Sequence, residues 1–167
     1  MIPDCPSYLQ TLSQWLLTEA TPALPQAWQQ GAAMRHGLLV QAVITEFDRA
    51  AARHVEENRA LRALFGKALG LAGDAVAGVA SPAAEEPVSR AMPQDLLAAL
   101  AQATKSEDTD WRVSALQEGN RALRALLEPL HAWVEGVGTP EARALEEAIW
   151  AELLASTERR LLPLGRF

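Results

Sequence analysis

Apolar residues recur every three or four positions along most of the chain, which is the spacing of one face of a helix. No segment shows the sustained alternation of apolar and polar residues, rich in Val, Ile, Thr and Tyr, that is typical of a strand. The pattern therefore predicts an all-α fold, a helical bundle of about five or six helices.

The clearest feature of this pattern is a pair of similar segments, NRALRALF at 58–65 and NRALRALL at 120–127. Each lies in a stripe of mostly apolar positions whose spacing alternates between three and four, as in a heptad seam. The first stripe is Ile44, Phe47, Ala51, His54, Asn58, Leu61, Phe65 and Ala68. The second is Val113, Leu116, Asn120, Leu123, Leu127, Leu130 and Val134. The sequence predicts two long, pseudo-symmetric, internally duplicated helices, each broken or bent just after the repeat, at Gly66 and at Pro129.

The remaining helices are predicted from their terminal signals. Ser7 is expected to cap the first helix, which TPALP at 21–25 stops. A short helix is predicted at 94–104, and Thr139 with Pro140 opens the last one. We expect a single helical domain over 1–167, with pseudo-repeat halves 1–72 and 94–162. The Ala/Gly/Pro-rich segment 73–93 would join the halves as a linker.

Asn58 and Asn120 are the two polar residues that interrupt otherwise apolar seams. Left without partners in a core, such an asparagine costs roughly 1–3 kcal/mol. Hydrogen-bonded to each other, the two would fix the register of the repeat helices. The alternative is that both line a polar pocket that binds a ligand.

Charged and aromatic side chains follow the same helical periodicity. The repeated arginines Arg59, Arg62, Arg121 and Arg124 fall off the seam and are expected on a solvated face. Five tryptophans lie within helical segments, and core packing is the default expectation for them. Trp28 and Trp133 are the candidates for a partner interface, where tryptophan is enriched.

The three histidines carry the only hints of metal or catalytic chemistry. His54 lies on the apolar seam, where it is expected to be buried and bonded to Asn58 or Glu57. Glu128 and His131 have the i,i+3 spacing of di-metal helical bundles, but the first repeat has no equivalent pair. We therefore expect no metal and no cofactor. The candidate ligand-binding residues are His54, Asn58, Asn120 and His131. A second alternative function is a metal-dependent enzyme that uses His54 and His131.

Composition narrows the classes of partner. The net charge is −6, which argues against non-specific binding to nucleic acid. Cys5 is the single cysteine, so an intrachain disulfide and a cysteine metal cluster are excluded. MIPDCPSYLQ, at the N-terminus, has no basic segment followed by an apolar one, and no run is long and apolar enough to span a bilayer. We expect a cytoplasmic protein with no membrane association.

Two stretches of the first half, YLQTLSQWLLTEATPAL at 8–24 and GLLVQAVITEFDRAA at 37–51, resemble a small bacterial all-helical family of unknown function. Members of that family tend to be encoded beside acyl-CoA dehydrogenases and aminoglycoside-phosphotransferase-like proteins. The resemblance covers about the first 70 residues and implies an N-terminal helix followed, through proline-containing turns, by a long helix. It brings no catalytic residues.

These observations predict a non-enzymatic interaction or accessory subunit, which associates with itself or with a protein partner. The alternative is a protein that binds a small apolar or acyl ligand between the two repeat helices. No nucleophile with an oxyanion hole, no phosphate-binding loop and no zinc-protease motif is present in the sequence.

Overall fold

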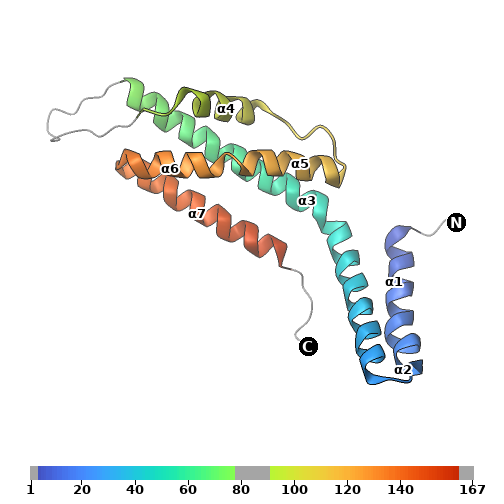
Figure 1. Cartoon of the computed structure of the whole chain (residues 1–167). Coiled ribbons are helices and arrows are strands. Elements are labelled where there is room, and N and C mark those ends of the chain that lie inside the picture. Colours follow the sequence, from blue (N-terminus) through green and yellow to red (C-terminus); the bar gives the residue numbers. More distant parts are fainter. Residues whose placement is uncertain (1–3, 78–90, 162–167) are drawn as a thin grey trace. The chain divides into compact units, whose positions relative to one another are not determined.

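The computed structural model describes residues 4–77 and 91–161, which are helical over most of their length and contain no strand (Figure 1). The all-α fold predicted from the sequence is confirmed. None of the helices described is both long and apolar enough to cross a membrane. The chain forms two compact units, residues 1–52 with 161–167, and residues 53–160. The division falls inside one helix, α3 (Ala27–Ala77), and not at the Ala/Gly/Pro-rich segment.

The first unit is a helical hairpin. Its first arm consists of α1 (Cys5–Trp15), a π-helical turn η1 (Leu16–Ala20) and α2 (Thr21–Ala23), and its second arm is the first half of α3. Asp4, not Ser7 as predicted, caps α1: its carboxylate accepts a hydrogen bond of 3.0 Å from the backbone N–H of Ser7. The arm ends before Pro25, as TPALP predicts.

Gly37 brings the two arms of this hairpin together. The hydroxyl of Ser13 donates a hydrogen bond of 2.9 Å to the carbonyl oxygen of Gly37. A Cβ atom at Gly37 would lie 2.7 Å from Cδ2 of Leu17, closer than carbon atoms can pack. Gly37 is therefore a close-approach residue within an unbroken helix.

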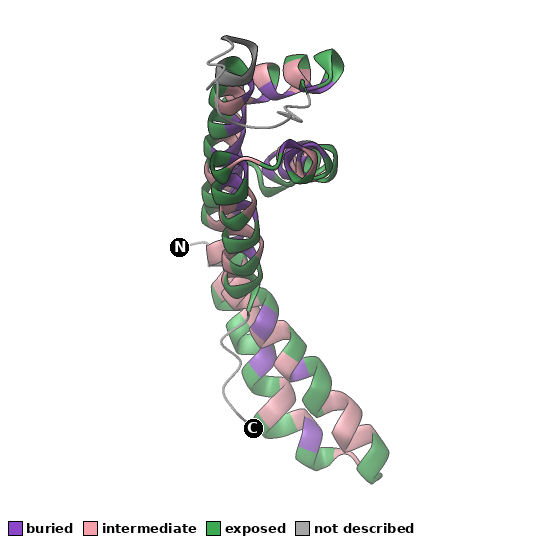
Figure 2. Ribbon diagram, turned by 90° about the vertical axis from the view of Figure 1, so that its left-hand side faces the viewer, coloured by how far each residue is buried: buried purple, intermediate pink, exposed green. Residues whose placement is uncertain are grey.

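The second unit has a core to which every one of its helices contributes. These helices are the second half of α3, α4 (Gln94–Lys105), α5 (Val113–Arg124), α6 (Leu127–Val137) and α7 (Pro140–Arg160). Fully or almost fully buried residues come from each of them: Leu61, Phe65, Leu100, Leu116, Leu123, Leu130, Val134 and Ile149. Figure 2 shows these buried positions in purple, and they are far sparser on the hairpin helices.

The two repeats fold differently. Helix α3 passes through Gly66 without a break, whereas the second repeat divides into α5 and α6 at Ala125–Leu126. Pro129 explains the division, because it has no N–H to donate to the carbonyl oxygen of Ala125. Only one of the two predicted long helices is therefore a single long helix. The first seam is buried from His54 onward, but Phe47 at its N-terminal end is 53% exposed.

Local residue chemistry also explains the turn between α6 and α7. Gly138 adopts φ +71° after α6, a left-handed conformation that favours glycine. The hydroxyl of Thr139 then accepts a hydrogen bond of 3.2 Å from the N–H of Ala142 and caps α7. Of the predicted linker 73–93, residues 73–77 belong to α3, and 78–90 lie outside the described residues.

Candidate functional site

Asn58 of α3 and Asn120 of α5 meet inside the second unit. Nδ2 of Asn120 donates a hydrogen bond of 3.0 Å to Oδ1 of Asn58. Nδ2 of Asn58 in turn donates one of 2.9 Å to the carboxylate of Asp108. Asn58 is fully buried and Asn120 is 4% exposed. The pair therefore satisfies its own polar groups in the core and supports the register interpretation over the pocket interpretation.

Asp108 also binds Arg62, one of the repeated arginines that the sequence predicted on a solvated face. Both terminal nitrogens of the guanidinium donate hydrogen bonds of 2.9 Å to the two carboxylate oxygens, while its Nε donates one of 3.2 Å to the hydroxyl of Ser106. Arg62 is thus a partly buried clamp and not part of a solvated face. The hydrogen bonds from Arg62 hold the pKa of Asp108 below its usual range, against the opposing effect of burial.

A second buried polar cluster surrounds Glu57, the neighbour of Asn58. The Glu57 side chain is fully buried and accepts hydrogen bonds of 3.1 and 2.7 Å from Nε and Nη2 of Arg160. The hydroxyl of Ser156 donates another, of 3.1 Å, and itself accepts one of 2.9 Å from Arg124. Sequence reasoning missed this cluster, because its partners lie about a hundred residues away along the chain.

His54 is 6% exposed, as its seam position predicts. Together with Asn120 it lines a pocket of about 240 Å³, whose other lining residues are Gln117, Arg121, Arg124 and Arg160. Two of these arginines are already engaged in the Glu57 cluster. The small volume and these internal bonds favour a structural role for the region.

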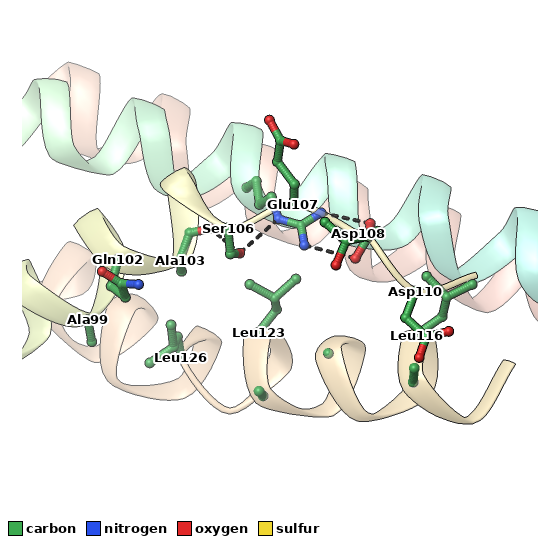
Figure 3. A pocket seen from close by; sticks show the side chains of 15 residues that line it. Ala99, Gln102, Ala103, Ser106, Glu107, Asp108, Asp110, Leu116, Leu123 and Leu126 are labelled. Atoms are coloured by element: carbon green, nitrogen blue, oxygen red, sulfur yellow. Dashed lines mark hydrogen bonds and ion pairs between the residues drawn. The ribbon is translucent and has the colours of Figure 1, made fainter. Parts of the chain in front are cut away.

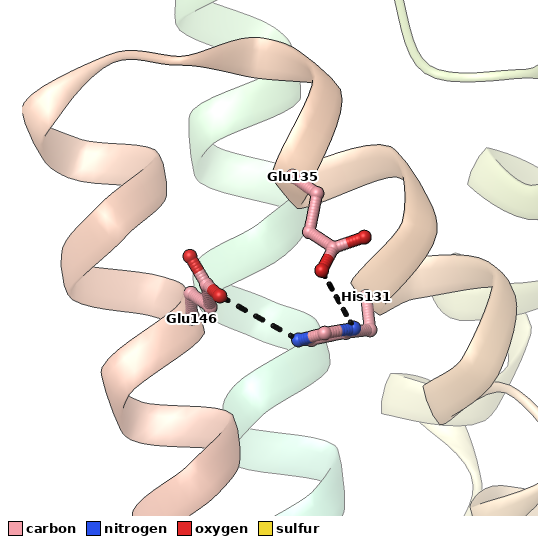
Figure 4. Close-up of side chains that lie close together, drawn as sticks. All are labelled: His131, Glu135 and Glu146. Atoms are coloured by element: carbon pink, nitrogen blue, oxygen red, sulfur yellow. Dashed lines mark ion pairs between the residues drawn. The ribbon is translucent and has the colours of Figure 1, made fainter.

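His131 lies elsewhere in this unit, on α6, between two carboxylates (Figure 4). Its Nδ1 is 3.8 Å from Oε1 of Glu135, one turn along the same helix, and its Nε2 is 3.8 Å from Oε1 of Glu146 on α7. The ring packs edge-on against Trp150, with 5.3 Å between ring centroids. Neither His54 nor Glu128 belongs to this group, so the predicted combination of His54 with His131 is not the one assembled in the described part of the chain.

A larger pocket, of about 530 Å³, lies between α4, the 106–112 connection and α5 (Figure 3). Four alanines and three leucines are among its fifteen lining residues, and both members of the Arg62–Asp108 pair line it as well. Its volume is in the range of small-molecule sites. Its lining includes Arg62 of α3 and Leu116 of α5, so both repeat helices contribute to it, but neither Asn58 nor Asn120 is among its lining residues.

Comparisons with protein-family models, curated proteins and solved structures found no match to this chain. The family resemblance of the first half remains a prediction from sequence pattern.

The hairpin carries an unusual amount of exposed apolar surface. Trp28, Leu39, Val43 and Phe47 of α3 are 69%, 62%, 54% and 53% exposed. We call these four residues the α3 stripe. Gly37, which contacts α1, is two residues from Leu39, and two residues turn a helix by about 200°. Leu39 therefore lies on the side of α3 away from Gly37, and the other three residues of the stripe lie within about 80° of Leu39 around the helix.

The tryptophans correct the expectation of core packing. Trp15, Trp28, Trp111 and Trp150 are all about half exposed or more. Only Trp133 is buried, at 3% exposed, within the core of the second unit. Trp133 therefore offers no surface to a partner, whereas the exposure of Trp28 is compatible with the interface role predicted for it.

Proposed function

We propose that this protein is a non-enzymatic interaction subunit that self-associates, and that two copies pair through their α3 stripes. The observation that carries the proposal is the exposure of Trp28, Leu39, Val43 and Phe47 on one side of one helix. Large exposed apolar patches on soluble proteins commonly mark protein–protein interaction sites.

The area of the stripe suits a dimer. A large side chain buries ~150–250 Å² when fully covered, so the exposed fractions of the four residues amount to on the order of 500 Å² per copy. Two copies would then bury about 1,000 Å² together, which is the lower bound for a specific interface. The neighbouring side chains Ala32, Arg35 and His36 would add to it.

Charge favours a second copy in antiparallel orientation. Arg35 and His36 flank the N-terminal half of the stripe, and Glu46 flanks its C-terminal half. In a two-fold antiparallel pair of stripes, the basic end of one helix lies beside the acidic end of the other. Such an isologous contact uses the same residues on both copies.

Placing a carboxylate at the centre of the stripe tests this proposal. We expect Val43→Glu to convert a dimer to a monomer, because two buried glutamates would face the apolar surface and each other. Size-exclusion chromatography with light scattering measures the mass. The matched control is Val113→Glu at a valine of the second unit that is 42% exposed.

The control variant should keep the oligomeric state of the unmodified chain. If Val43→Glu and Val113→Glu have the same mass as the unmodified protein, the α3 stripe is not the interface. Circular dichroism of both variants separates loss of pairing from loss of helix.

A second candidate function is binding of an apolar or acyl ligand, favoured by the 530 Å³ pocket between α4 and α5. Its wall includes Ala99, whereas the neighbouring Ala98 is exposed and faces elsewhere. We expect Ala99→Phe to fill the pocket and abolish binding of a dansyl-labelled medium-chain fatty acid. Ala98→Phe should leave the fluorescence titration unchanged, and equal binding by both variants would exclude this pocket.

A further inference from the structure

The group formed by His131, Glu135 and Glu146 plays no part in the proposed self-association. An imidazole and two carboxylates come from two helices, α6 and α7, that pack directly against each other. One ligand atom from each residue lies within 4.8 Å of the others. The group is therefore positioned by the packing of the second unit and not by a flexible loop.

Nε2 of His131 provides the observation that separates this group from an ordinary surface cluster. It is shielded from solvent and has no hydrogen-bond partner in the described part of the chain. The nearest carboxylate oxygen, on Glu146, is 3.8 Å away, beyond hydrogen-bonding distance. A polar atom that is shielded from solvent and has no partner costs folding free energy, unless a bound water or ion interacts with it.

Apart from His131, the two carboxylates of the group have no cationic partner among the residues described. Neither Glu135 nor Glu146 forms an ion pair with a lysine or arginine among the residues described, although most other partly buried carboxylates of this unit do. With a neutral imidazole, the group carries two negative charges. It therefore matches a divalent cation in charge.

The distances suit a small ion. Nitrogen and oxygen ligands lie about 2.0–2.1 Å from Zn²⁺, so two of them in tetrahedral arrangement are about 3.4 Å apart. The observed 3.8 Å between His131 and Glu146 is within a side-chain adjustment of that value. Glu135 lies 3.8 Å from Nδ1 and its side chain is 59% exposed, so it would bind an ion at Nε2 only after turning toward that nitrogen. Edge-on contact with Trp150 holds the ring in place.

We propose that His131, Glu135 and Glu146 form a binding site for a divalent first-row transition metal ion, with Zn²⁺ as the best-suited ion. Imidazole nitrogen together with carboxylate oxygen is a donor set that suits Zn²⁺. Three protein ligands leave a coordination position for water, as in open zinc sites. A bound ion would link α6 to α7 in addition to the turn at Gly138 that connects them along the chain.

Calorimetric titration of the full-length chain with ZnCl₂, after removal of metals with a chelator, tests the site. We expect one ion per chain. His131→Ala and Glu146→Gln should each weaken binding by at least about tenfold, the usual cost of altering a metal site. The matched control is Glu147→Gln, an exposed carboxylate next to Glu146 on α7, which should bind as the unmodified chain does.

A second readout keeps the test independent of folding defects. Co²⁺ bound by nitrogen and oxygen gives a visible absorption band, which should appear with the unmodified chain and with Glu147→Gln but not with His131→Ala. Thermal melts followed by circular dichroism show whether each variant is folded. Absence of saturable Zn²⁺ binding to the unmodified chain, or equal binding by His131→Ala, would overturn the proposal.

Discussion

We expect the Arg160→Met variant to lose about 2–3 kcal/mol of unfolding free energy, because the carboxylate of Glu57 is left buried without its main partner. Glu57 is fully buried and accepts both of its shortest charged hydrogen bonds from Arg160. The loss falls below the larger values typical of broken buried pairs, since Arg160 is itself 43% exposed and Arg53 lies 3.9 Å from Glu57. Chemical denaturation at neutral pH measures the change.

A double variant supplies the control for this result. Glu57→Leu with Arg160→Met removes both charges, so most of the lost stability should return. Equal stability of the single variant and the unmodified chain would show that Arg160 does not stabilise Glu57.

The same pair predicts a pH dependence. Burial raises the pKa of Glu57, but hydrogen bonds and charge from Arg160, with help from Ser156 and Arg53, outweigh it and leave the pKa below the ordinary value of 4.5. A lowered carboxyl pKa contributes stability that is complete above 4.5 and is lost as the pH falls through the folded-state pKa. The difference between the unmodified chain and Arg160→Met should therefore be largest at neutral pH and shrink below 4.5.

The second large effect concerns the asparagine pair. We expect Asn58→Leu to cost about 2–3 kcal/mol, because the amide of Asn120 is left in the core without its acceptor. Asp108 would also lose the hydrogen bond that Asn58 donates to it. Equilibrium denaturation of Asn58→Leu, Asn120→Leu and the double variant forms a double-mutant cycle.

The cycle should give a favourable coupling of about 1–2 kcal/mol, with the double variant less destabilised than the sum of the single ones. Gln117→Leu is the matched control, an exposed amide on the same helix as Asn120, and should change stability by less than about 0.5 kcal/mol. Additive effects of the two asparagine substitutions would contradict a direct bond between these side chains.

The sequence was sufficient for features that local chemistry determines. Helical periodicity predicted the fold class, Thr139 marked a real helix start, and Pro129 marked a real break. The match between the two NRALR segments brought Asn58 and Asn120 together correctly, because identical seam positions on adjacent helices tend to face each other. These inferences need only spacing and residue type.

Features that depend on distant parts of the chain were missed or misplaced. Arg62 reads as a surface residue, yet Asp108 from a connecting segment clamps it. Glu146 carried no signal as a partner of His131, since only the packing of α7 on α6 brings it close. Phe47 belongs to an apolar seam by spacing, but no element of the hairpin described here covers it. Periodicity identifies a face, and only the folded chain shows what lies against it.

Self-association through the α3 stripe is the central claim, and sedimentation equilibrium of the unmodified full-length chain tests it most directly. The measurement needs no variant and no assumption about the interface. We predict a species of twice the chain mass of 18.1 kDa, in reversible equilibrium with the monomer. A single species of 18.1 kDa at every concentration tested would contradict the claim.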